Sequence, residues 1–168
     1  MLKDVLKDTK YGYTSNSEKE FIIKIDTEFE RLGYTSGGAT SHGFCWGKDM
    51  IIYQKKGVKS NKSYARIYLR DDGAILRMYF SKVDKQSDFI KNSKPHIKEV
   101  FTGDFGNCKH CKNENDEGFC KFQKIYSIDG MNIQKCNGNT FYFFKPKIEL
   151  ITDYIEVFST FYPPKRRK

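Results

Sequence analysis

The sequence has neither a long apolar run nor an N-terminal apolar segment that ends in small residues. A membrane-spanning helix requires about 20 consecutive apolar residues, and an export signal requires the second pattern. We therefore expect a cytoplasmic protein that makes no membrane contact.

Several catalytic motifs are also missing. The chain contains no Walker loop, no dinucleotide-binding glycine pattern, no HExxH motif and no paired-carboxylate constellation. Nucleotide hydrolysis, dinucleotide-dependent redox chemistry and zinc-peptidase activity therefore have no support from motifs. We predict a protein that acts by binding and not by catalysis.

Four of the five cysteines have the spacing of a closed zinc site: Cys108, Cys111, Cys120 and Cys136. A Cys-x-x-Cys step lets one turn of backbone direct two thiolates at one ion, and zinc prefers a tetrahedron of such ligands. An odd number of cysteines and no export signal favour a metal over a disulfide framework. We predict a structural Zn²⁺ ion, with His110 as a less favoured ligand, and the sequence leaves zinc against iron open.

A predicted hairpin brings the two distant cysteines of this set together. Asp129-Gly130 separates two alternating runs, and both residues accept the positive φ that a two-residue turn requires. With Ile128 opposite Met131, Gln123 lies opposite Cys136. Cys120 and Cys136 are then near the same open end of the hairpin.

The remaining elements follow from periodicity. A helix starts at Ser17, with Glu20 completing a capping box, and carries the apolar stripe Phe21, Ile22, Ile25, Phe29 and Leu32 up to Gly33. Strands are predicted at 50–54, 64–70 and 74–81, short helices at 84–91 and 95–101, a strand at 140–144 and a last helix at 153–162. This order indicates an α+β fold with an antiparallel sheet flanked by helices.

We predict two parts packed as one unit. Residues 1–101 form the α+β core, and residues 102–168 form a four-cysteine zinc lobe with a three-stranded meander and the C-terminal helix. The sequence leaves open whether the two sheets are continuous.

The basic residues are concentrated in one stretch of the chain. Lys and Arg number 30 against 21 Asp and Glu, a formal net charge of +9. A positive charge of this size favours polyanions. Between Lys48 and Arg70 the only acid is Asp49, and the basic residues are Lys48, Lys55, Lys56, Lys59, Lys62, Arg66 and Arg70.

A second hairpin, turned at Asp72-Gly73 with Arg70 opposite Ile75, sorts these residues onto faces. Ala65, Ile67, Leu69, Leu76, Met78 and Phe80 form the core face. The opposite face carries Tyr64, Arg66, Tyr68, Arg70, Ile75, Arg77 and Tyr79. Alternating aromatic and guanidinium groups can stack bases and contact phosphates, so we predict a nucleic-acid or nucleotide ligand here, assisted by Lys55, Lys56, Lys59 and Lys62. An ordinary partly covered sheet face is the competing interpretation.

Two other functions remain open. A protein-interaction or inhibitor module, of a kind found in phage or host defence, is the second hypothesis. The third is a small-molecule binder or enzyme that uses the Gly37–Cys45 loop, although the Cys45-Trp46 step lacks the surroundings of a catalytic cysteine. A free cysteine beside Phe44 and Trp46 is more simply a small apolar residue.

The runs Cys45-Trp46-Gly47-Lys48-x-Met50-Ile51-Ile52-Tyr53 and Tyr64-Ala65-Arg66-Ile67-Tyr68 occur with Lys98-Glu99-Val100-Phe101-Thr102-Gly103 and the cysteine cluster. From about residue 40 onward, this combination resembles a group of small uncharacterised cysteine-cluster proteins of clostridia and relatives. The resemblance implies the metal ligands already named and no activity.

Overall fold

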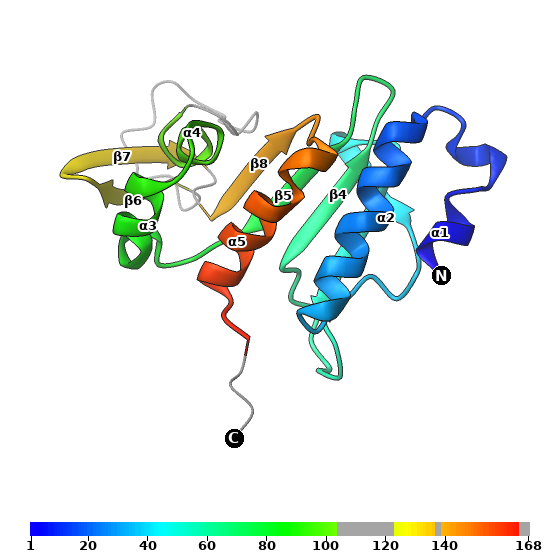
Figure 1. Ribbon diagram of the computed structural model, residues 1–168, viewed down its shortest axis with the longest axis horizontal. Coiled ribbons are helices and arrows are strands. Elements are labelled where there is room, and N and C mark those ends of the chain that lie inside the picture. The colour runs from blue at the N-terminus through cyan, green and yellow to red at the C-terminus, as the bar shows by residue number, and fades with distance from the viewer. Residues whose placement is uncertain (104–122, 137–138, 165–168) are drawn as a thin grey trace. The chain divides into compact units, whose positions relative to one another are not determined.

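The computed structural model describes residues 1–103, 123–136 and 139–164. The chain is α+β with an antiparallel sheet and helices that include a C-terminal one, as predicted (Figure 1). It divides into two compact units. Unit 1 comprises Met1–Met78 and Phe143–Lys168, and unit 2 comprises Tyr79–Tyr142. The boundary predicted from the sequence, between residues 101 and 102, falls within unit 2.

The sheet of unit 1 is built around three long strands. β3 (Asp49–Lys55), β4 (Ala65–Leu69) and β5 (Ile75–Tyr79) pair antiparallel in that order. Two short strands, β1 (Tyr34–Thr35) and β2 (Ser41–His42), pair antiparallel with β3. A short N-terminal helix, α1 (Leu2–Val5), precedes them.

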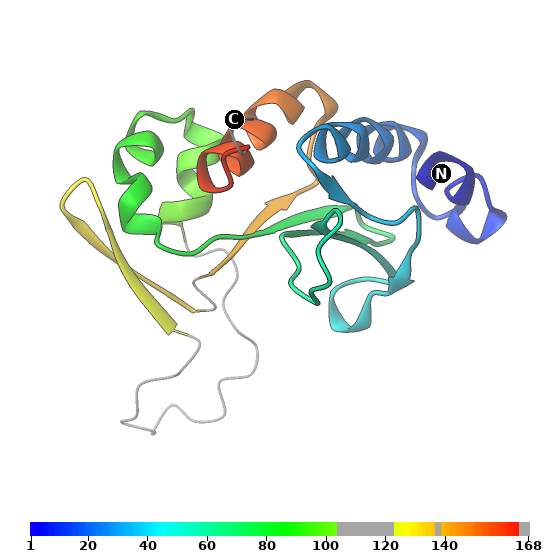
Figure 2. The same cartoon turned by 90° about the horizontal axis from the view of Figure 1, so that it is seen from below.

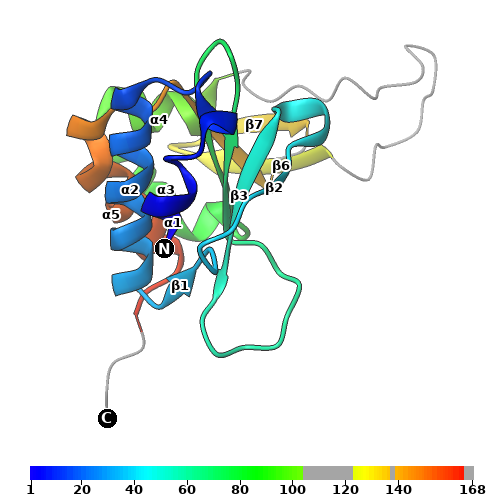
Figure 3. The same cartoon turned by 90° about the vertical axis from the view of Figure 1, so that its right-hand side faces the viewer.

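Two helices cover one face of this sheet. α2 (Asn16–Arg31) and α5 (Ile151–Phe161) lie on the same side of β3 and β4 in two views (Figures 2 and 3). The ring centroid of Phe29 on α2 is 4.5 Å from that of Tyr53 on β3 and 4.8 Å from that of Phe158 on α5. The predicted apolar stripe of α2 is confirmed at Phe21, Ile22, Ile25 and Phe29, which are all buried. Leu32, the fifth predicted member, is the C-cap residue just beyond the helix and is half-buried.

The start of α2 corrects the predicted cap. Ser15, not Ser17, is the N-cap, and its side chain forms a capping box with Glu18. The sequence holds two overlapping Ser-x-x-Glu patterns, which local chemistry does not separate. The earlier pattern is the one used, and Oε1 of Glu18 also accepts a hydrogen bond from the Ala74 amide at 2.7 Å.

The β4–β5 hairpin keeps its predicted faces but not its predicted register. Tyr68, not Arg70, lies opposite Ile75, so the connection is longer than a two-residue turn. Gly73 has a φ of 118°, whereas Asp72 is not among the residues with positive φ, so the two-residue turn is not formed. A shift of two residues leaves each side chain on its face, and the six predicted core residues are buried.

The described part of unit 2 contains two helices and a hairpin. α3 (Ser87–Asn92) follows a 3₁₀ turn, and α4 (Pro95–Thr102) begins with Pro95 at its first turn, as predicted. β6 (Gln123–Ile128) pairs antiparallel with β7 (Met131–Cys136). Their register is the predicted one, with Ile128 opposite Met131 and Gln123 opposite Cys136. Asp129 and Gly130 have φ values of 54° and 76°, which confirms the turn.

The predicted strand at 140–144 exists as β8 (Thr140–Phe144), but the three-stranded meander is wrong. β6 and β7 form a two-stranded sheet, and β8 is the neighbour of β5. The Lys145 amide donates to the Ala74 carbonyl at 2.9 Å, and the Phe80 amide donates to the Asn139 carbonyl at 2.9 Å. Thr140 to Phe143 are buried, so this strand's pairing is decided by the core that it enters.

The last helix starts two residues earlier than predicted, at Ile151, after a 3₁₀ turn at Ile148–Leu150. Tyr154, Ile155, Val157 and Phe158 of its predicted stripe are buried, and Phe161 is partly exposed. Among the described residues, no helix has the length and apolar character to cross a membrane.

Candidate functional site

Three residues of the predicted Tyr/Arg face converge in unit 1. Nη1 of Arg66 and Nη1 of Arg77 donate to the hydroxyl of Tyr68 at 3.4 and 3.2 Å. The other side of the Arg66 guanidinium donates to Oγ of Ser63 at 3.1 Å. Two guanidinium groups on one phenol oxygen concentrate positive charge at this point of the sheet.

Trp46, which was not predicted to belong to this site, covers part of the cluster. The guanidinium carbon of Arg77 lies 5.2 Å from the centroid of the Trp46 ring, a cation–π distance. Trp46 belongs to a 3₁₀ turn, Phe44–Trp46, that is followed by Gly47. A Cβ at Gly47 would lie 2.7 Å from the Leu69 carbonyl oxygen, so this close approach requires glycine.

The cover makes the face less open than alternation alone suggests. Tyr68 is 2% exposed and Arg77 is 9% exposed, whereas Arg66 is half-buried. Arg70 forms an ion pair with Asp72 at 2.5 Å, and Lys48 pairs with Asp71 at 2.6 Å. Of the predicted arginines, Arg66 is therefore the one best placed to meet a ligand.

Three of the four predicted loop lysines lie in the loop between β3 and β4, and Lys55 is the last residue of β3. The loop between β3 and β4 extends from the sheet (Figure 3), and Lys56, Lys59 and Lys62 are exposed while Lys55 is half-buried. Within the described ranges, no acidic side chain pairs with any of these four lysines. Ser63 connects the end of this loop to the Arg66 guanidinium.

Tyr64 departs from the predicted face. It precedes β4, and its ring centroid is 4.9 Å from that of Tyr34 and 4.9 Å from that of Tyr162, which follows α5. Nζ of Lys62 lies 4.8 Å from the Tyr64 centroid and 5.9 Å from the Tyr162 centroid. Tyr64 therefore belongs to an aromatic cluster on the helix side of unit 1. Tyr79, also predicted for the face, is half-buried and belongs to unit 2.

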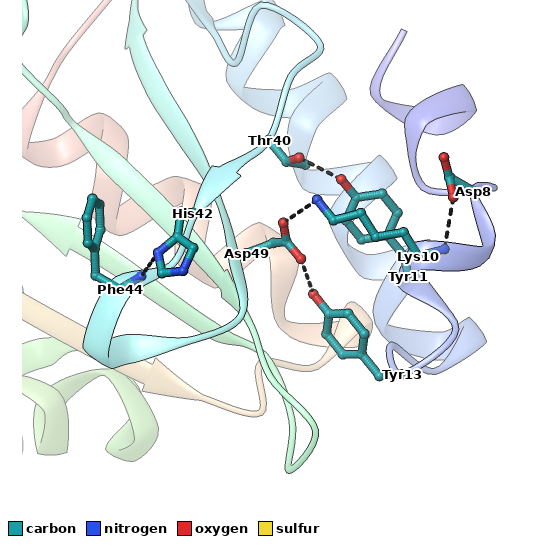
Figure 4. A network of polar contacts seen from close by, with 8 residues as sticks. All are labelled: Asp8, Lys10, Tyr11, Tyr13, Thr40, His42, Phe44 and Asp49. Atoms are coloured by element: carbon teal, nitrogen blue, oxygen red, sulfur yellow. Dashed lines mark hydrogen bonds and ion pairs between the residues drawn. The ribbon is translucent and has the colours of Figure 1, made fainter.

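A polar network near the N-terminus centres on Asp49, the single acid of the basic stretch (Figure 4). Nζ of Lys10 lies 2.7 Å from Oδ1 of Asp49, and the Tyr13 hydroxyl donates to Oδ2 at 2.7 Å. Burial acts to raise the pKa of Asp49, but the hydrogen bonds from Lys10 and Tyr13 outweigh it and lower that pKa. Burial and the Asp49 carboxylate together raise the pKa of Tyr13.

This network fastens the N-terminal segment to β3. Both Asp49 oxygens are engaged, and the hydroxyls of Tyr11 and Thr40 form a further hydrogen bond of 2.6 Å. A carboxylate held ionised in this way is a poor proton carrier near neutral pH. The network was not predicted from the sequence, although a lone acid beside a strand start in a basic stretch is a signal for it.

The Gly37–Cys45 loop shows no assembled nucleophile. Cys45 is exposed, and Nδ1 of His42 accepts a hydrogen bond from the Phe44 amide at 3.0 Å. Across the part of the chain that the structure describes, no hydrogen bond joins Cys45 to a base. A Cys–His pair requires such a contact.

Of the predicted metal ligands, Cys136 lies among the described residues. Cys136 is half-buried at the open end of the β6–β7 hairpin, opposite Gln123. Cys108, Cys111, Cys120 and His110 lie outside the described residues. Among the residues described, no group of three or more His, Cys, Asp or Glu side chains could hold a metal ion.

A groove of about 570 Å³ lies beside the start of α2 in unit 1. Its charged lining comprises Lys145 and Lys147 against the acids Glu18, Asp71, Asp72 and Glu149. With acids outnumbering lysines, the groove is not suited to an anionic ligand.

Comparison with protein-family models, with curated proteins and with solved structures finds no match to this chain.

Proposed function

We propose that this protein binds single-stranded nucleic acid through unit 1. The observation that supports this best is the convergence of Arg66 and Arg77 on the Tyr68 hydroxyl, at the end of a loop with three exposed lysines. Guanidinium groups donate to phosphate oxygens in a fork geometry that a phosphodiester matches.

The loop lysines supply the second part of the interface. Lys56, Lys59 and Lys62 are exposed on one loop, and Ser63 joins this loop to Arg66. Each phosphate contact releases condensed counterions, so affinity depends on salt concentration. A net charge of +9 favours the encounter with any polyanion.

The test is the salt dependence of binding. A fluorescent oligodeoxythymidine of about 12 nucleotides fits the site size of such proteins, and its anisotropy gives the dissociation constant between low and physiological salt. Replacing Lys56, Lys59 and Lys62 together by Gln should reduce the slope of log K against log salt by about 2, since each single-strand phosphate contact contributes about 0.7.

A matched control removes the same charge elsewhere. Replacing Lys3, Lys7 and Lys24, all exposed in unit 1, by Gln lowers the net charge equally and should leave the slope unchanged. If both triple variants lose the same slope, the attraction is diffuse and the loop is not an interface. If the unmodified protein does not bind at low salt, the proposal is wrong.

We also propose a structural zinc ion held by Cys108, Cys111, Cys120 and Cys136. The confirmed hairpin register, which puts Cys136 at the open end, supports it. Native mass spectrometry should detect one metal ion per chain, and Cys136→Ser should lose it and destabilise unit 2. If the unmodified protein carries no metal and unfolds in the same transition as Cys136→Ser, the proposal is wrong.

A protein-interaction or inhibitor module is the second candidate. Phe44 favours it, because this side chain is 72% exposed on a backbone with a φ of 51°. Exposed aromatic residues often anchor protein interfaces. A stoichiometric partner lost with Phe44→Ser, while oligonucleotide binding is absent, would favour this function. A small-molecule function of the Gly37–Cys45 loop would instead show as an activity lost when Cys45 is alkylated.

A further inference from the structure

The aromatic cluster at the end of α5 holds an exposed cation from the chain itself. Nζ of Lys62 lies over the ring of Tyr64 at 4.8 Å and near the ring of Tyr162 at 5.9 Å. Both rings are partly exposed, and Tyr34 packs below them as a buried support at 4.9 Å from Tyr64. Burial and the neighbouring tyrosines raise the pKa of Tyr162 to about 12, so its ring remains neutral at physiological pH.

We propose that the face of Tyr64 now covered by Lys62 is a base-stacking position, and that Lys62 moves from the ring to a phosphate when a nucleic acid binds. This inference rests on the proposed function and adds where a base is held. The Tyr64 and Tyr162 rings meet at 78° with centroids 4.9 Å apart, so they contact each other edge to face. A base therefore stacks on one ring and is not sandwiched between two.

The relative strengths of the two contacts favour the exchange. A cation–π contact at an exposed site increases the equilibrium constant for contact formation about two- to fivefold. Stacking of a base on an aromatic side chain increases the binding constant about five- to 150-fold. Lys62 is an exposed side chain on a loop, so its ammonium is free to follow a phosphate when the base takes the ring face.

The charge of the surroundings decides which occupant suits the ring. Two tyrosines can also receive a ligand cation, such as a methylated lysine. Here Lys55, Lys56 and Lys59 precede the site in the sequence, and the chain carries a formal net charge of +9. A cationic guest is repelled by these residues, whereas a nucleotide brings the negative charge that complements them.

The test separates the base from the phosphate. Affinities are measured for a labelled oligodeoxythymidine of about 12 nucleotides and for an oligonucleotide of the same length whose central positions are abasic. The unmodified protein should bind the first about tenfold more tightly. Tyr64→Leu should abolish this preference with the salt slope unchanged, and Tyr64→Phe should retain it.

Lys62→Ala gives a measurement that does not depend on the packing of Tyr64. This change should increase the preference for the base-containing strand, because no ammonium competes for the ring, and should reduce the salt slope by about 0.7. A lower preference in Lys62→Ala would contradict the exchange. Phe44→Leu, which removes another exposed aromatic ring of unit 1, is the control and should leave the preference intact.

The possible failures are distinct. Equal binding of the two oligonucleotides by the unmodified protein would overturn the stacking position and leave phosphate binding by the loop in place. Equal loss of preference in Phe44→Leu and Tyr64→Leu would overturn the assignment to Tyr64. No binding of either oligonucleotide would remove the proposed function together with this inference, and tight binding of a trimethyl-lysine peptide in its place would assign the rings to a cation.

Discussion

The two units hold their helices to their strands by different means. In unit 1 aromatic rings join the helices to the sheet, with Phe29 packed between Tyr53 and Phe158 at centroid distances of 4.5 and 4.8 Å. The Glu18 carboxylate of α2 adds one polar contact there, to the Ala74 amide. Unit 2 has an aromatic group too, but polar side chains also fasten its hairpin. The Lys135 ammonium donates to the Val100 carbonyl near the end of α4.

A second polar contact supports the same helix end in unit 2. The Tyr126 hydroxyl donates to the Phe101 carbonyl at 2.5 Å, next to the carbonyl that Lys135 engages. The last carbonyls of a helix have no partner within the helix, and a cation there also complements the helix dipole. Lys135 is 3% exposed, and its Nζ lies 5.1 Å from the Phe141 ring centroid.

This difference indicates how each unit responds to substitution. When a buried apolar side chain is shortened, the loss of stability grows with the volume of the cavity that remains after neighbouring side chains relax. A buried polar group that loses its partner retains the whole cost of its desolvation. Unit 1 should therefore be sensitive to the size of its core residues, and unit 2 to the identity of single polar atoms.

The largest expected effect is in the core of unit 1. Phe29→Ala should lower the free energy of unfolding by about 3–5 kcal/mol, because a fully buried ring is replaced by a cavity. Urea unfolding followed by circular dichroism measures it. Phe44→Ala, at a ring that is 72% exposed, should change stability by less than about 0.5 kcal/mol.

The next effect tests the polar attachment of unit 2. Lys135→Met preserves most of the side-chain volume but leaves the Val100 carbonyl without this donor, which should cost about 1–3 kcal/mol. Hydrogen exchange of the β6 and β7 amides measures the loss. Its matched control is Lys124→Met, since Lys124 is the exposed residue directly across the hairpin. Equal exchange rates in the Lys135→Met and Lys124→Met variants would show that the Lys135 contact does not stabilise the hairpin.

A smaller effect distinguishes the two Ser-x-x-Glu patterns at the start of α2. Ser15→Ala removes the observed N-cap and should lower the free energy of unfolding by about 1 kcal/mol. Ser17→Ala should have little effect. Thermal unfolding of both variants measures the difference, and the opposite ranking would restore the cap predicted from sequence.

The smallest effect is a pH dependence in unit 1. The pKa of Asp49 is lower in the folded protein, so its contribution to stability is present above the unfolded pKa and is lost as pH falls through the folded one. The stability of the unmodified protein should fall relative to Asp49→Asn between about pH 5 and pH 2. Parallel curves of unfolding free energy against pH for the two proteins would show that the network does not hold Asp49 ionised.

Features of the fold were predicted correctly from the sequence where a short segment determines the local conformation. The Asp129-Gly130 turn set the β6–β7 register to the residue, because two adjacent residues both adopt positive φ. At Asp72-Gly73 the same dipeptide did not form that turn, since only Gly73 has positive φ there. The faces of β4 and β5 were still predicted correctly, because alternation is unaffected by a shift of two residues.

The candidate site was predicted less well. Tyr68, Arg66 and Arg77 were assigned to one face, and the structure brings them together. The cover by Trp46 was not predicted, because it depends on Gly47 allowing a distant segment to approach β4. Tyr64 was predicted to lie on the face with Arg66 and Tyr68, but its ring contacts Tyr162 instead. Tyr64 precedes β4, so its side chain need not follow the alternation of that strand.

Local sequence was enough to predict the helices, the β6–β7 hairpin, the faces of β4 and β5, and the α+β class, because these depend on turn conformation and on apolar periodicity within short segments. Three features follow from the folded chain: which serine caps α2, which strand pairs with β8, and the position of Lys62 over Tyr64. Each of these depends on residues far apart in the chain, whose meeting is set by the packing of the core.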